Sequence, residues 1–230
     1  MVVAGTERSG QKKTMFFRAF ASFMAFAALT VIASGASFDF RTPEAFNVIK
    51  VELDTAFGSG LLSGELRGTR GLVDFDPTHP EATRGSVRLD VRNLKLRHPK
   101  SNQDVHSSIW MDTNRFPHVT FEMKGIRKVR WRGGLLKGEL TGALTLKGKT
   151  KELILPATFR YLRGKRRDVD GRAGDLLEIR AETSILRGDF GINAGGMLEA
   201  VANEISVTVN LLAKSDSLRP LLPSPLLTRP

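Results

Sequence analysis

The chain has 230 residues, enough for one sizeable domain or two small ones, and its apolar (41%) and charged (26%) fractions exclude a wholly disordered protein. Cysteine is absent, so disulfides, thiolate metal sites, cysteine nucleophiles and lipidated cysteines are excluded. The formal net charge of +11 favours anionic membrane surfaces or phosphate groups as partners, although a basic surface also serves solubility alone.

The N-terminus has the pattern of a secretory signal peptide. Basic residues precede an uncharged run that starts at Ala19, and small residues occupy positions 33–36. The uncharged run continues to Phe38, so a retained membrane anchor is the alternative. We expect residues 1–36 to be a cleavable signal peptide and the protein to be periplasmic or secreted.

The middle of the chain alternates between apolar and polar residues in short segments that turns separate. The clearest segments are 86–92, 119–124, 177–185 and 204–211. About eight such segments predict an all-β antiparallel domain, either a sandwich or a barrel. Gly138 and Gly142 stand at apolar positions, where the tapering interior of a barrel needs small residues. We expect residues 37–214 to form an antiparallel eight-stranded, lipocalin-like barrel, either packed solid or holding one small ligand.

One short helical insertion interrupts this pattern before the strand that contains Phe121. We expect the polar residues Asn102 and Asp104 to cap the helix. Ile109 and Trp110 should then pack at the mouth of the barrel, and Pro117 should restart the sheet.

No pattern in the sequence supports a catalytic site or a metal site. The histidines are scattered, and His106 and Asp104 are two residues apart, so they would diverge on a helix. No nucleophile elbow, phosphate-binding loop or dinucleotide fingerprint is present. We expect no catalytic residue, no metal and no cofactor. An enzyme that depends on His106 is the alternative.

Two basic clusters, Arg127–Arg132 and Arg163–Arg167, fall at predicted hairpin tips. They are candidates for contact with an anionic membrane surface, and solvated turns are the alternative. An exported protein seldom meets nucleic acid, so we expect no nucleic-acid partner, while a homodimer stays open. Residues 215–230 contain four prolines and no period, which predicts a disordered C-terminal tail.

The predicted barrel interior is the strongest candidate site, because it could enclose an elongated lipid. Each CH₂ that leaves water contributes about 0.8 kcal/mol, but a lipid leaving a bilayer gains far less, so selectivity must come from cavity shape and polar contacts at the mouth. A packed core is the alternative. The expected ligand contacts are Phe75, Trp110, Phe121, Met123, Leu144 and Phe159, with His106 near a head group.

Four motifs resemble those of the YceI-like family of exported, lipocalin-like proteins. They are Gly71–Pro77; Asn102, Asp104 and His106 followed by Phe116, Pro117 and Phe121; Leu140–Lys151; and Arg187–Asn193. Their order and spacing agree with the family over nearly the whole expected barrel.

The resemblance implies an eight-stranded barrel with a short helical segment and a polyisoprenoid chain in its lumen. It also implies periplasmic handling of lipids or isoprenoid quinones without catalytic residues. Gln103, Ser107, Leu186 and the pair Ala45–Phe46 depart from the family's pattern, so we expect altered head-group contacts. The function that follows is sequestration or carriage of a polyisoprenoid or similar amphiphile. An envelope stress-response or interaction module is the alternative.

Overall fold

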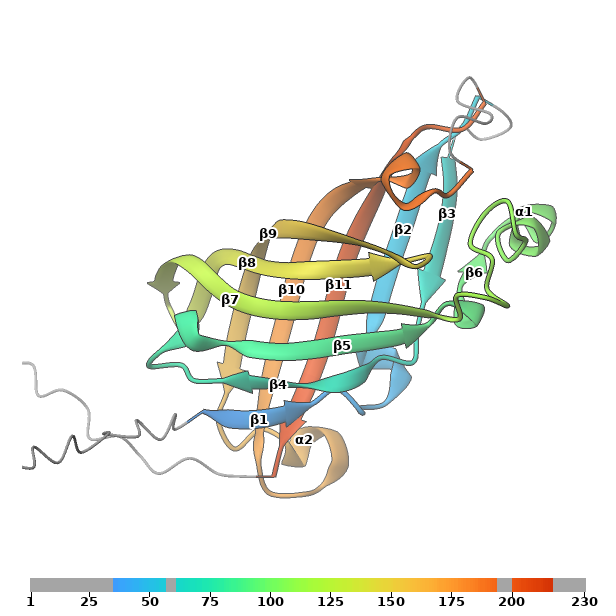
Figure 1. Cartoon of the computed structure of the whole chain (residues 1–230). Coiled ribbons are helices and arrows are strands. Elements are labelled where there is room, and N and C mark those ends of the chain that lie inside the picture. The colour runs from blue at the N-terminus through green and yellow to red at the C-terminus, as the bar shows by residue number, and fades with distance from the viewer. Residues whose placement is uncertain (1–34, 57–60, 194–199, 217–230) are drawn as a thin grey trace, which may run out of the picture. The chain divides into compact units, whose positions relative to one another are not determined.

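The computed structural model describes residues 35–56, 61–193 and 200–216. These residues form an 11-stranded antiparallel sheet with a few short helices (Figure 1). Residues 1–34 of the expected signal peptide and residues 217–230 of the expected C-terminal tail lie outside the described residues. The first strand begins at Ala36 and the last strand ends at Ser215.

The strands are long in the second half of the chain and short in the first. They are β1 (Ala36–Asp39), β2 (Val48–Asp54), β3 (Leu61–Leu66), β4 (Arg70–Phe75), β5 (Arg84–Asp90), β6 (Lys95–Leu96), β7 (His118–Arg132), β8 (Leu135–Leu146), β9 (Lys149–Leu162), β10 (Asp175–Leu186) and β11 (Glu204–Ser215). The helices are η1 (Glu44–Phe46), η2 (Pro80–Ala82), η3 (Val91–Asn93), α1 (Pro99–Asp104), α2 (Arg167–Asp170) and η4 (Arg187–Phe190).

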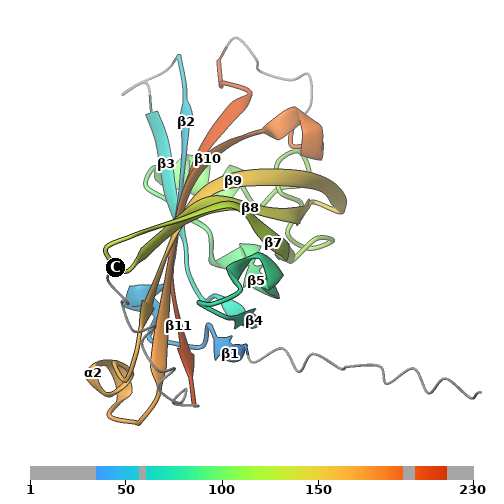
Figure 2. The ribbon, with the colours of Figure 1, turned by 90° about the vertical axis from the view of Figure 1, so that its left-hand side faces the viewer.

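Eight of these strands form a closed ring, in the order β1-β4-β5-β7-β8-β9-β10-β11. The ring closes where Asp39 of β1 pairs with Lys214 of β11. Farther along, β11 pairs with β2, β2 with β3, and β3 with β6, which continues from β5 through η3. At the end away from β1, β2, β3 and β6 therefore take the place of β1 and β4 in the ring. This is the wider end of the barrel (Figure 2). The expected antiparallel eight-stranded barrel is confirmed.

The alternating sequence pattern accounts for the two faces of the sheet. In the β10–β11 pair, Ile179 lies opposite Leu211 on the inner face, and Arg180 lies opposite Asn210 on the outer face. Neighbouring residues of a strand point to opposite sides, so a half-buried sheet needs this period of two. Gly142 stands on the inner face of β8, where only glycine fits, because a Cβ at this position would lie 2.4 Å from the Phe121 ring.

The β1 end of the barrel is sealed by aromatic side chains. The rings of Phe75 and Phe159 stack with centroids 6.1 Å apart, and Phe38 meets Phe75 edge-on at 6.5 Å. Below them, the buried Asp175 carboxylate accepts hydrogen bonds from the Tyr161 hydroxyl at 2.6 Å and the Gly164 N–H at 2.7 Å. Buried aromatic pairs of this kind fill space and fix geometry. The interior at this end is therefore a packed core.

The helical insertion begins earlier than the sequence pattern predicts. Pro99 occupies the first turn of α1, and His98 rather than Asn102 or Asp104 stands at the N-cap. The capping prediction is wrong because proline, with its fixed φ, starts the helix three residues sooner. The Asn102 side chain instead accepts a hydrogen bond from Leu96 N–H at 2.8 Å and ties α1 to β6. The next strand, β7, starts directly after Pro117, as expected.

Candidate functional site

An apolar cavity of about 210 Å³ lies inside the wider part of the barrel. Its wall consists of Leu, Ile, Val, Met and Ala side chains with two aromatic residues, Trp110 and Phe121. Thr183 is the one polar residue in the described wall. One water needs only about 10–15 Å³ of such space and also needs polar partners. The cavity therefore suits an apolar guest much larger than water.

The register of the strands builds this wall row by row. Val87 of β5 lies opposite Phe121 of β7, which lies opposite Leu144 of β8, and all three line the cavity. Across the barrel, Val207 of β11 lies opposite Val51 of β2 in the same way. Directly opposite residues share a face of the sheet, so each inward row adds one apolar layer to the wall.

The loop between α1 and β7 closes over the wide end of the barrel. It brings Trp110 and Met111 into the cavity wall, where they pack with Leu146, Phe190 and Ile192. Ile109, by contrast, is 63% exposed, so the expectation that its side chain packs at the mouth is wrong. Its neighbour Trp110 points inward and Ile109 faces solvent. The loop is thus a partial cover of the mouth rather than a plug.

Two cations, Lys147 and Arg187, hold the chain segments at this end of the barrel through backbone carbonyl groups. The Lys147 ammonium donates to the carbonyl oxygens of Ser108 and Ile109, both at 3.1 Å, and of Gly191 at 3.0 Å. The Gly191 carbonyl belongs to the turn after η4, so Lys147 joins two separate segments of the mouth. Burial lowers the pKa of Lys147, and these carbonyl dipoles compensate for the lost hydration.

Arg187 is the second cation; it is the first residue of η4, directly after β10, and is fully buried. Its guanidinium donates to the carbonyls of Ala202 at 3.0 Å, Ile192 at 3.1 Å and Val201 at 3.1 Å. Burial lowers the pKa of Arg187, but a guanidinium starts so high that it stays charged at neutral pH. Arg187 therefore ties the chain on both sides of residues 194–199 to the end of the barrel.

The expected ligand contacts fall into two groups. Trp110, Phe121, Met123 and Leu144 line the cavity. Phe75 and Phe159 are not part of its described wall, because they belong to the sealed aromatic end.

His106 also lies outside the described cavity wall. Its Nδ1 atom is buried and has no hydrogen-bond partner among the described residues, while its carbonyl accepts from the Thr113 N–H at 3.3 Å. The described geometry assigns His106 a backbone role in shaping the mouth loop.

Several residues of the wall and mouth were not singled out from the sequence. The wall also includes Leu53, Leu62, Ile185, Ile192 and Ile205. The alternating pattern places most of these on the inner face, but it ranks no aliphatic position above another. Nothing in the sequence marked Lys147 and Arg187 as functional residues, except that both fall within motifs that resemble those of the family. Their role depends on carbonyl groups from distant segments, which no local pattern predicts.

Arg163–Arg167 lies in the β9–β10 connection, as expected, whereas Arg127–Arg132 forms the last six residues of β7, directly before the β7–β8 turn. The cations of the two clusters differ in whether they are free to bind a partner. Arg127 and Lys128 both pair with Glu139, at 3.3 Å and 2.6 Å. Arg166 is buried and pairs with Asp170 at 3.1 Å, so it cannot serve as a phosphate contact, contrary to the expectation for its cluster. Its burial follows from its position under the β9–β10 connection, where it also contacts Asp216.

The described residues contain neither a cluster of metal ligands nor a membrane-spanning helix. No group of three or more His, Asp or Glu residues within it is placed to hold a metal ion. None of its helices has the length and apolar character needed to cross a membrane.

The chain resembles known proteins in sequence and fold. Protein YceI of Shigella flexneri is 27% identical over 200 residues, which cover 87% of this chain and 96% of that protein. The crystal structure of Burkholderia cenocepacia BcnA matches with a TM-score of 0.60 at 21% identity, covering 74% of this chain and 98% of BcnA. A polyisoprenoid binding domain from Saccharophagus degradans, implicated in plant cell wall breakdown, matches with a TM-score of 0.55 at 9% identity, covering 79% of this chain and 99% of that domain.

The model of the YceI-like domain matches residues 36–213, from the first residue of β1 almost to the end of β11. The match spans every strand of the closed ring and both segments that Lys147 and Arg187 hold together. The chain therefore belongs to the YceI-like family.

Proposed function

We propose that this protein is a non-catalytic binding protein that carries or sequesters a long apolar lipid of the polyisoprenoid class in its barrel. The observation that carries the proposal is the cavity, whose described wall is apolar except for Thr183. A pocket of this kind binds by shape and burial, and it offers no convergent polar groups for chemistry. The polyisoprenoid binding domain of Saccharophagus degradans, which shares the fold, supports this class of guest.

The energetics favour a carrier over a one-way trap. Each CH₂ that moves from water into the wall contributes about 0.8 kcal/mol, so a chain of many carbons is firmly held away from water. The same chain leaving a bilayer is already in an apolar medium, and the net change is then small. A protein of this kind can therefore return its lipid to a membrane at little cost in free energy and keeps it out of water between membranes.

Export to the periplasm or beyond is part of the proposal. The positive N-terminal region, the uncharged run from Ala19 and the small residues at 33–36 support it. The β1 strand begins at Ala36, so removal of residues 1–36 would take away only the first residue of the barrel strands. Mass spectrometry of the protein recovered from its host should give a mature N-terminus between residues 34 and 38, and a full-length chain in the membrane fraction would argue for a retained anchor.

The lipid itself is tested by purifying the full chain from its host without detergent. Native mass spectrometry and organic extraction should then reveal a bound isoprenoid. Ala181 lines the cavity, so Ala181→Leu should lower the amount of lipid per protein several-fold by filling the cavity. Ala143 lies on the opposite, outer face of β8, outside the described wall, and is as buried as Ala181, so Ala143→Leu is the matched control.

Thermal unfolding of both variants separates loss of lipid from loss of fold. A wild-type protein that always emerges without lipid, and that takes up none from isoprenoid-loaded vesicles, would overturn the proposal. That result would instead favour a scaffold that acts through its outer surface.

A further inference from the structure

Two lysines occupy lumen-facing positions at the mouth of the barrel. In the β8–β9 pair, Lys149 lies opposite Leu146 and Lys151 lies opposite Leu144. Both leucines line the cavity. Directly opposite residues of an antiparallel pair share a face of the sheet, so both lysines stand on the inner face of β9. The inward residues of β9 are therefore apolar inside the barrel and end in two cations at its rim.

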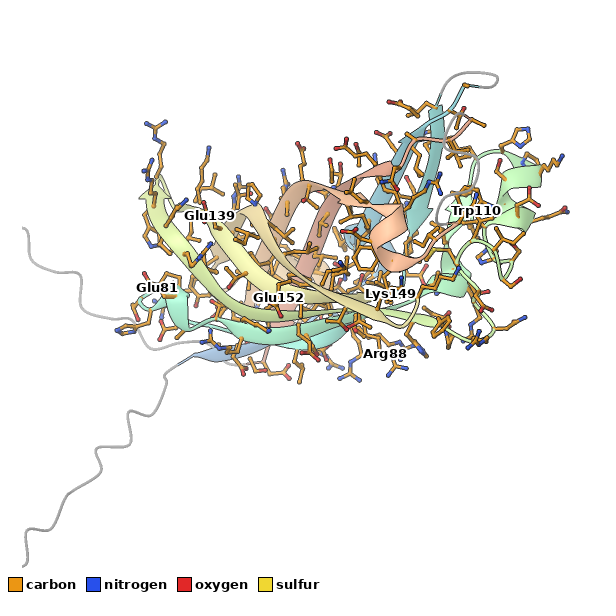
Figure 3. The ribbon with its side chains drawn as sticks, turned by 45° about the horizontal axis from the view of Figure 1, so that its top comes forward. Glu81, Arg88, Trp110, Glu139, Lys149 and Glu152 are labelled. Carbon is orange, nitrogen blue, oxygen red and sulfur yellow. The ribbon has the colours of Figure 1, made fainter. Side chains whose placement is uncertain are left out.

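The Lys149 ammonium lies close to the cavity wall. Its Nζ is 3.1 Å from the position that a Cβ on Gly191 would take, and the next residue, Ile192, lines the cavity. Lys147 reaches the same turn, since its Nζ bonds the Gly191 carbonyl at 3.0 Å. Figure 3 shows Lys149 beside the β8–β9 turn, at the end of the barrel that carries Trp110.

The ammonium groups of Lys147, Lys149 and Lys151 differ in the partners that they already have. An ammonium has three donors, and those of Lys147 all go to backbone carbonyls, so this lysine organises the rim. Lys151 faces Asp189 at 3.9 Å in an exposed, loose pair. Lys149 is exposed and makes no ion pair with any described residue. The rim therefore presents one cation without a counter-charge in the described structure and a second that is weakly held.

We propose that this rim binds the anionic head group, a phosphate or carboxylate, of the amphiphile whose chain occupies the cavity, with Lys149 and Lys151 as its contacts. The inference rests on the proposed function, because it assigns a head group to that same guest. The apolar wall cannot distinguish head groups, so the rim decides between an acid and an alcohol of equal chain length. Cations at the end of an apolar cavity favour the acid through charge-assisted hydrogen bonds.

The size of the preference follows from the exposure of the lysines. Exposed ion pairs are weak, so two such contacts together should give about a 3- to 10-fold preference, which falls as salt rises. The test uses geranylgeranyl monophosphate and geranylgeraniol, which share one chain and differ only in the head group. Their Kd values are measured by calorimetry on the full chain at low and high salt.

Three variants accompany the wild type. Lys149→Gln and the double variant with Lys151→Gln remove the proposed contacts, and Lys137→Gln is the control. Lys137 is an exposed lysine of β8 that lies opposite Arg130 of β7 in the strand register, near the β7–β8 turn and away from the mouth. We expect the double variant to bind both probes equally and the control to keep the wild-type preference.

The outcomes separate this inference from the function on which it rests. Equal binding of both probes by the wild type, or equal weakening of both by the double variant, would overturn the head-group assignment and leave the lipid carrier intact. Failure of the wild type to bind either probe would overturn both proposals. A parallel titration uses inorganic phosphate alone, which should not compete with the phosphate probe at millimolar concentration. Full competition would assign the rim to free phosphate instead of a lipid.

Discussion

The guanidinium of Arg187 lies over the ring of Trp110, 5.7 Å from its centroid. Arg187 begins η4 and Trp110 lies in the loop after α1, two segments far apart in the chain. Trp110 lines the cavity, while Arg187 binds carbonyls on both sides of residues 194–199. This contact therefore joins the cover of the cavity to the strand ends that frame it.

Arg187→Lys should lower the free energy of unfolding by about 2–4 kcal/mol. A lysine cannot reach the carbonyls that the guanidinium holds, and a buried carbonyl left without a donor costs about 1–3 kcal/mol. Urea unfolding monitored by circular dichroism measures the change. Arg180→Lys on the same strand is the control, because Arg180 lies on the outer face and is exposed. Equal stability of the two variants would contradict the role of Arg187.

Lys147→Met should loosen the mouth loop without unfolding the barrel. Methionine matches the length of lysine but has no donors, so three carbonyls lose a charged partner. Because the site is only partly buried, we expect a loss of about 1–2 kcal/mol. Hydrogen exchange should speed up in the loop segment that carries Trp110 and stay unchanged in β10.

Lys137→Met is the matched control for Lys147→Met, since its ammonium is exposed and lies away from the mouth. It should leave exchange in the loop as in the wild type. If Lys147→Met also leaves the loop unchanged, the three carbonyl bonds do not hold the mouth.

The fold was predictable from the sequence because it depends on a local regularity. The alternation around Val87, Phe121 and Ile179 assigns each residue to the inner or outer face, and this assignment predicts an antiparallel β domain. The choice of a barrel over a sandwich needed the glycines of β8 and the family resemblance as well. The role of the glycines of β8 was also predictable, because the inner face of a barrel needs small residues. In the structure the Phe121 ring leaves no room for a side chain at Gly142.

The candidate site was only half predictable, because alternation does not report height along the barrel axis. Phe75, Phe159 and Phe121 all face inward, yet the first two seal the narrow end and the third lines the cavity. Strand stagger decides between these positions, and stagger comes from pairing between distant segments. The role of Arg187 could not be predicted either, because its partners are backbone carbonyl groups, which every sequence possesses.

Gly142→Ala should destabilise the barrel by about 1–3 kcal/mol through overpacking. The added methyl group would lie 2.4 Å from both the Phe121 ring and the Glu122 carbonyl oxygen. The ring can turn toward the cavity but the backbone oxygen cannot retreat, so we also expect weaker lipid binding. Thermal unfolding and lipid content of the purified variant measure the two effects. A variant as stable and as well loaded as the wild type would show that β8 has room here.

Asp90→Asn should weaken the junction at which β5 turns into η3 and on to β6. The Asp90 carboxylate accepts the Arg92 backbone N–H at 3.0 Å and is paired with the Arg92 guanidinium. Side-chain hydrogen bonds from Arg92 lower the pKa of Asp90 from 3.8 to about 2. Asparagine keeps an acceptor for the N–H, so the substitution isolates the charge.

The pH dependence of this effect has a defined sign. Because the folded-state pKa of Asp90 is depressed, its contribution is fully present above pH 3.8 and is lost as the pH falls toward 2. The pair is largely exposed, so we expect Asp90→Asn to cost only about 0.5–1 kcal/mol at neutral pH. Urea unfolding between pH 7 and pH 2 should show wild type and variant converging at the acid end. Asp104→Asn, at the end of α1, should give no such convergence, since Asp104 makes no ion pair within the described residues. A stability difference between wild type and Asp90→Asn that stays constant down to pH 2 would mean that the charge of Asp90 does not stabilise the turn into β6.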